Sequence, residues 1–137
     1  MSTSFRRRAL GALVIVGLLA ALGASAAAAG SPFTGLWRST DIDGSSQQLM
    51  IGGGGATQHV VYLDHGASVC GWTPGAHGPA AIARGIGTEA GGILSASMPV
   101  ICLTHPPSSI GSYDFEFSYD AATDTLSDGS GVTWSRP

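Results

Sequence analysis

Residues 113–120 read Tyr113-Asp114-Phe115-Glu116-Phe117-Ser118-Tyr119-Asp120, so that four aromatic side chains alternate with three acids and a serine. A period of two places successive side chains on opposite faces of a β-strand. The aromatic face is therefore expected to be buried, while the acidic face meets water. This pattern is typical of an antiparallel sheet with one solvated side.

Short strands separated by turn residues are expected on both sides of this segment. Turns are predicted at Asp43-Gly44, 64–66, 89–92, 121–124 and 128–129. The predicted strands are 35–39, 47–51, 60–63, 68–72, 82–86, 93–97, 125–127 and 132–134, with a further one at 100–103. The prolines are expected between strands rather than within them. About eight short strands joined as consecutive hairpins predict an all-β antiparallel meander, and an up-and-down β-barrel is favoured over the alternative, a β-sandwich.

The N-terminal segment has the features of a secretory signal peptide. Three arginines, Arg6 to Arg8, precede an uncharged run over 9–24, and small residues follow before Gly30. The predicted organisation is a signal peptide over 1–29 and a single secreted or extracytoplasmic domain over 30–137. The alternative is an uncleaved N-terminal membrane anchor, because the apolar run is close to the shortest that spans a bilayer.

The composition excludes several function classes. The chain contains no lysine and no asparagine, which excludes a P-loop lysine, a Schiff-base lysine and N-glycosylation. Residues 30–137 carry three arginines against nine acids, a formal charge of −6 that argues against a nucleic-acid partner. Each of these arginines (Arg38, Arg84 and Arg136) is expected to have a fixed partner. Frequent alanine and glycine without lysine or asparagine suggest a GC-rich bacterial genome.

The two cysteines predict one structural disulfide. Cys70 and Cys102 both lie in the exported part and stand 32 positions apart. A redox or metal pair is the alternative, but it favours Cys-x-x-Cys spacing or a second pair of cysteines.

Two short features resemble the lipocalin/calycin pattern. They are Gly35-Leu36-Trp37 in the first predicted strand and Arg136 after the last. In that family a Gly-x-Trp opens the barrel and a late arginine packs over the tryptophan ring. The resemblance thus implies structural roles for Gly35 and Arg136 and a barrel that holds a small hydrophobic molecule. Residues 30–137 are fewer than in a usual lipocalin, and the smaller avidin-like barrels of that superfamily are closer in size.

Aromatic side chains are the candidate ligand-binding residues. They form the wall of an apolar pocket in the functional interpretation and ordinary core in the alternative one. The candidates are Trp37, Tyr113, Phe115, Phe117, Tyr119 and Trp134. The acids Asp114 and Glu116 share the other face of their strand and are expected to be solvated, rather than to form a glycosidase pair.

No metal, cofactor or catalytic group is predicted. His77 and His105 are the weak metal candidates, because the disulfide would bring their loops together, but two histidines without a placed carboxylate make a poor site. Residues 41–45 resemble the start of a calcium loop, yet Gly52 stands where an EF-hand needs glutamate; Asp43-Gly44 is therefore expected to be a hairpin turn. Ser68 lacks the following glycine and the helix of a hydrolase nucleophile elbow.

Three functions therefore remain compatible with the sequence. A secreted, non-enzymatic barrel that binds a small apolar molecule or an extracellular protein ranks first. A structural or interaction module with a filled core ranks second, and a hydrolase ranks last. The volume inside the barrel separates the first two. The mature form is expected to be a monomer that does not span the membrane.

Overall fold

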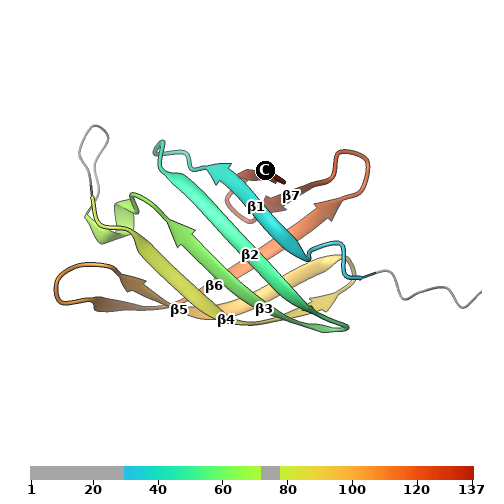
Figure 1. Ribbon diagram of the computed structural model, residues 1–137, viewed down its shortest axis with the longest axis horizontal. Coiled ribbons are helices and arrows are strands. Elements are labelled where there is room, and N and C mark those ends of the chain that lie inside the picture. Colours follow the sequence, from blue (N-terminus) through green and yellow to red (C-terminus); the bar gives the residue numbers. More distant parts are fainter. Residues whose placement is uncertain (1–29, 72–77) are drawn as a thin grey trace, which may run out of the picture.

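Eight antiparallel strands form a closed barrel, in which each strand pairs with the next and β8 returns to β1 (Figure 1). The computed structural model describes residues 30–71 and 78–137; the predicted signal peptide, Trp72 and His77 lie outside them. The predicted all-β meander and the barrel are confirmed. The strands are β1 (Gly35–Thr40), β2 (Ser46–Gly54), β3 (Thr57–Asp64), β4 (Ala81–Ala90), β5 (Ile93–Cys102), β6 (Ser108–Asp120), β7 (Thr125–Asp128) and β8 (Thr133–Ser135).

Two of the predicted strand assignments were wrong. Residues 68–70 form a short 3₁₀ helix, η1 (Ser68–Cys70), which Gly71 ends with a positive φ of 91°. Residues 93–97 and 100–102 belong to one strand, β5, so Pro99 lies within a strand instead of between two. The β4–β5 ladder has no pairs between Ala83–Val100 and Thr88–Ser95, so the missing N–H of Pro99 breaks no ladder bond with β4.

One end of the barrel is filled by side chains. Trp37 is completely buried, and its indole Nε1 donates a 2.7 Å hydrogen bond to the carbonyl oxygen of Phe33. Phe33 is itself completely buried at the start of the described chain. The other large buried side chains are Leu49, Ile51, Gln58, Val60, Leu94, Met98, Phe117, Leu126 and Trp134. This part of the interior is a packed core.

Glycine at position 87 makes room for that core. A Cβ on Gly87 would lie 2.8 Å from Leu94 Cδ1 and 3.1 Å from Val60 Cγ2. We expect Gly87→Val to lower the free energy of unfolding by about 1–3 kcal/mol through overpacking. Gly52→Val is the matched control, because nothing lies within 4 Å of a Cβ there. Urea denaturation of both variants is the measurement, and equal losses would contradict this account.

Arg136 joins the two ends of the described chain. Its guanidinium carbon lies 3.9 Å from the centroid of the Trp37 ring, the contact that the lipocalin/calycin resemblance implies. Its Nε forms an ion pair of 3.0 Å with Asp124 Oδ2, and its other nitrogens donate to the carbonyl oxygens of Thr34 and Pro32. Gly35, with φ +138°, leaves the space that this guanidinium occupies.

The expectation of fixed partners was wrong for the other two arginines of the domain. Arg38 and Arg84 are exposed on the outside of the barrel. Across residues 30–71 and 78–137, the one ion pair is that between Arg136 and Asp124.

The barrel is closed by few strand pairs. β1 and β8 are in register only at Arg38 and Ser135, supported by a hydrogen bond from Ser39 Oγ to the Thr133 carbonyl. β6 pairs with β5 along most of its length but with β7 only from Phe117 to Asp120. Residues 108–116 of β6 therefore have no β7 or β8 partner on that side.

The predicted disulfide between Cys70 and Cys102 is confirmed, with a Cα–Cα distance of 5.6 Å. It ties η1 to the end of β5, beside the start of β4. The bridge therefore fixes η1 against the barrel wall.

Candidate functional site

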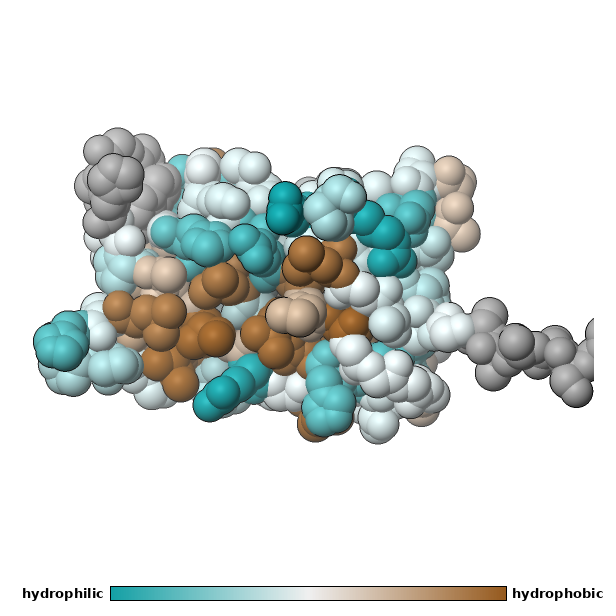
Figure 2. All heavy atoms as spheres, in the orientation of Figure 1, coloured by the Kyte–Doolittle hydropathy of each residue, from teal (hydrophilic) through white to brown (hydrophobic). Residues whose placement is uncertain are grey.

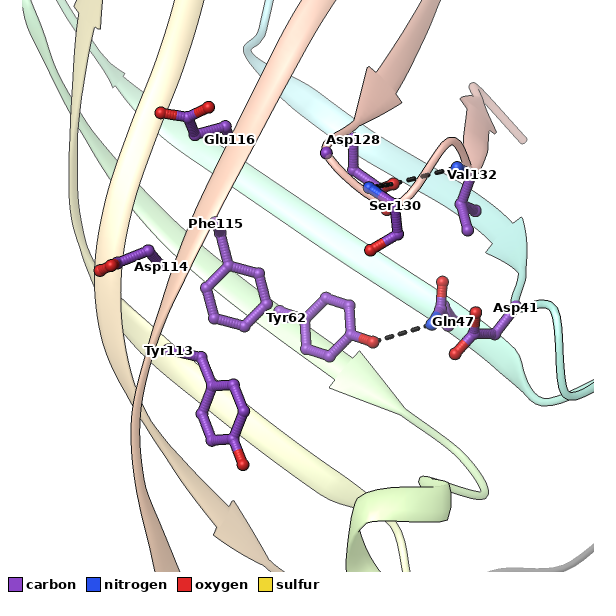
Figure 3. Close-up of a pocket in the computed structure, with 11 residues that line it drawn as sticks. Asp41, Gln47, Tyr62, Tyr113, Asp114, Phe115, Glu116, Asp128, Ser130 and Val132 are labelled. Atoms are coloured by element: carbon purple, nitrogen blue, oxygen red, sulfur yellow. Dashed lines mark hydrogen bonds between the residues drawn. The ribbon is translucent and has the colours of Figure 1, made fainter.

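A cavity of about 500 Å³ lies where β6 has no β7 partner (Figure 3). We call it the mouth cavity; β6 forms one side of it and the β7–β8 turn the other. A second hollow of about 360 Å³ shares five of its lining residues and continues toward η1 and Asp64. The mouth cavity is lined by Asp41, Gln47, Tyr62, residues 113–116, residues 128–130 and Val132.

Aromatic rings form part of the cavity wall. Tyr62 of β3 packs against Phe115 of β6 with ring centroids 5.2 Å apart, and against the buried Trp134 at 5.9 Å. Tyr113, two residues before Phe115 in β6, is 43% exposed. Figure 3 shows Tyr62, Phe115 and Tyr113 side by side below the β7–β8 turn. These rings offer a surface for the apolar part of a ligand.

The structure divides the six predicted ligand-binding aromatics into three groups. Tyr113 and Phe115 line the mouth cavity. Phe117, Trp37 and Trp134 lie in the packed core. Tyr119 is half-buried against Phe33 and Trp37, and its hydroxyl donates to Asp124.

A chain of hydrogen bonds runs through the floor of the cavity. Gln47 Nε2 donates to the Tyr62 hydroxyl at 2.8 Å, and that hydroxyl donates to Asp64 Oδ2 at 3.4 Å. The amide of Gln47 thus turns its NH₂ group toward Tyr62. The Gln47 oxygen, Oε1, is buried and accepts no hydrogen bond, although the residue is only 4% exposed.

The carboxylates around the cavity differ in the number of hydrogen bonds that they accept. Asp128 accepts hydrogen bonds from the backbone N–H groups of Ser130 and Val132 and from the indole of Trp134. Asp41 accepts one, from the N–H of Ile42.

Burial and charge also shift ionisation equilibria at the cavity. Partial burial, with repulsion from Asp43, Asp64 and Asp128, raises the pKa of Asp41. Burial and the charges of Asp64 and Asp41 raise the pKa of Tyr62, so its hydroxyl stays protonated and remains a donor.

Neutralising Asp41 is expected to stabilise the free protein. Because its pKa is raised on folding, the folded state takes up the proton first as the pH falls. The stabilisation from that proton is complete below the ordinary aspartate pKa and is lost as the pH rises through the raised value. We therefore expect Asp41→Asn to melt at a higher temperature than the wild type at pH 7, with a difference that disappears near pH 3. Thermal denaturation from pH 3 to 7 tests this, and a variant that melts lower at pH 7 would refute it.

Of the residues that line the mouth cavity, Tyr113 and Phe115 were predicted from sequence as ligand-binding residues, whereas Asp41, Gln47 and Tyr62 are among those that were not. The alternation along the strands could have predicted the inward positions of Gln47 and of Asp64, which lines the second hollow. Gln47 continues the inward face of Leu49 and Ile51, and Asp64 continues that of Val60 and Tyr62. The register pairs Gln47 with Asp64, so both polar residues fall at the same end of one hairpin.

The remaining candidates lie away from the cavity. His105 is exposed in the β5–β6 connection. Over residues 30–71 and 78–137, no three His, Cys, Asp or Glu side chains are arranged to hold a metal ion. The segment from Asp41 to Ser45 is a tight turn in which Gly44 has φ +89° and its N–H bonds to the Asp41 carbonyl.

Comparisons with protein-family models, with curated proteins and with solved structures each gave no match. No helix in the described part of the chain is long and apolar enough to cross a bilayer.

Proposed function

We propose that residues 30–137 form an exported, non-enzymatic, monomeric barrel that binds a small molecule in the mouth cavity. The carrying observation is the division of the interior, which is packed at the Phe33 end and holds a cavity of about 500 Å³ at the other. That volume lies within the range of about 300–1,000 Å³ typical of small-molecule sites. The apolar body of the ligand would lie against Tyr62 and Phe115.

The chemistry of the site supports binding rather than catalysis. Tyr62 remains a neutral hydroxyl, and Asp128 is engaged by three donors, so neither is poised as a nucleophile or a base. His65 contacts the amide of Gln48 and not a hydroxyl or thiol. Export is supported by the N-terminal sequence and by the disulfide, which persists in oxidising compartments.

Native mass spectrometry of the protein purified from its secretion host tests the proposal. We expect a monomer that begins near Gly30 and carries an added mass lost on denaturation. Ser130→Trp places a bulky ring at the rim of the cavity, and this variant should lose the added mass. Ala122→Trp, in the exposed β6–β7 turn, should retain it. A bare mass in all three proteins would contradict ligand binding.

A specific observation also favours the second candidate, an interaction module. Figure 2 shows hydrophobic side chains gathered over β2 to β4 on the outside of the barrel. The register places Leu36, Met50 and Val61 side by side there, and Met50 is 56% exposed. Exposed apolar patches of this kind are typical of protein-binding surfaces. A stable dimer in the same mass spectra, lost in Met50→Glu, would favour this function.

A further inference from the structure

All the charged side chains around the two hollows are acidic. No arginine or histidine occurs among the described residues that line either one. The acids are Asp41, Asp64, Asp114, Glu116 and Asp128. A ligand entering this part of the barrel therefore meets a negative potential, which attracts cations and repels anions.

Asp114 and Glu116 are exposed on the outer face of β6 and point away from Tyr62 and Phe115 in Figure 3. Among the other three carboxylates, the geometry singles out Asp41. Asp128 already accepts three N–H donors, and Asp64 accepts from the Tyr62 hydroxyl and the Gly66 N–H. Asp41 accepts one backbone N–H, through Oδ1. Its second oxygen is thus available to a donor from a ligand, and three nearby aspartates disfavour its charge when the site is empty.

Gln47 supplies an independent sign of a missing donor. Its NH₂ group bonds to the Tyr62 hydroxyl, and its Oε1 is buried without a hydrogen bond. Figure 3 shows this oxygen beside Asp41, directed toward the space below the β7–β8 turn. A buried acceptor without a donor costs free energy, and a ligand that supplies an N–H group would recover it.

We propose that the ligand of the mouth cavity is an organic cation, a protonated amine that donates to Asp41 and to Gln47 Oε1 while its apolar body packs against Tyr62 and Phe115. This inference rests on the function proposed above and adds the charge of the ligand. Amines combine donors with a positive charge, and aromatic faces also attract cations. A metal ion fits less well, because the described carboxylates do not converge on one point.

Three probes that share a phenyl ring on a short chain test the sign of the charge. Binding of 2-phenylethylamine, 2-phenylethanol and phenylacetate is to be measured by calorimetry at pH 7 and low salt. We expect the amine to bind about tenfold or more tightly than the alcohol, and phenylacetate to bind most weakly. If the alcohol or phenylacetate binds as tightly as the amine, the cation is refuted while the binding function stands. If none of the probes binds, both proposals fail.

Matched variants locate the charge recognition. Asp41→Asn should weaken amine binding about tenfold and alcohol binding much less, because the alcohol donates a hydrogen bond without a charge. Retained alcohol binding also reports that the cavity is intact. Glu89→Gln removes the same charge at the other end of β4, where Glu89 accepts from Ser31, and should leave both affinities unchanged. Equal losses of amine affinity in the two variants would show a general charge effect and overturn the assignment to Asp41.

Discussion

Replacing Trp37 by alanine is expected to lower the free energy of unfolding by about 3–5 kcal/mol. The side chain is 0% exposed, its indole N–H bonds to Phe33, and its ring supports the Arg136 guanidinium. The substitution removes all three interactions and leaves a cavity at the packed end of the barrel. A domain of this size has a total stability of about 5–15 kcal/mol, so this loss brings the variant close to unfolding.

Urea denaturation followed by far-UV circular dichroism is the measurement, because it does not depend on the tryptophan itself. Leu36→Ala is the matched control, since Leu36 is the neighbouring residue on the outer face of β1 and is only half-buried. Its loss should be clearly smaller. Similar losses in the two variants would mean that Trp37 is not a central core residue.

Removing the disulfide is expected to have an effect of similar size. Cys70 and Cys102 enclose a sequence separation of 32, and the chain-entropy relation gives roughly 3–4 kcal/mol for a loop of that length. The bond also holds η1 near the second hollow, because Ser68 and Val69 line it. Loss of the bond should therefore loosen the cavity as well as the fold.

The double variant Cys70→Ser/Cys102→Ser and the reduced wild type should show the same lowered melting temperature. Reductant should have no effect on the double variant, which is the control for side reactions. A wild type whose melting temperature is unchanged when the bond is reduced would refute the stabilising role.

The two ends of the barrel are built to different requirements. At the packed end, Gly87 and Phe33 allow large side chains to fill the interior. At the open end, Asp41 is held among like charges, which costs stability in the free protein. Gln47 Oε1 also lacks a donor there, as Gln58 Oε1 does at the packed end. Binding sites commonly contain such local costs, and a ligand that satisfies Asp41 and Gln47 would offset them.

Periodicity along the chain predicted the fold well because barrel strands bury one face. The alternation over 113–120 is present in β6, where Phe117 is buried and its neighbours are exposed. Prediction failed where local composition resembled a strand but packing decided otherwise. Residues 68–70, Ser-Val-Cys, were predicted to begin a strand. They instead form a 3₁₀ helix, which the disulfide ties to the end of β5.

Less of the candidate site than of the fold could be predicted from the sequence. Alternation placed Tyr113, Phe115, Phe117 and Tyr119 on one face, and it could not separate those that line a cavity from those that lie in the core. That separation depends on β7 being only four residues long, which leaves the first part of β6 without a partner on that side. Strand length and barrel closure are set by contacts between distant segments.

The sequence by itself determined the strand face periodicity, the meander order and the disulfide, because these follow from local alternation, short turns and the only pair of cysteines. The tertiary structure alone decided where the barrel stays open and which polar groups meet there. Asp41, Gln47, Tyr62 and Asp128 come from four different parts of the chain, and they share one cavity only because the strands pair in this register. The repulsion between their charges and the missing hydrogen bond of Gln47 arise only when the fold brings these residues together, so no single segment of sequence shows them.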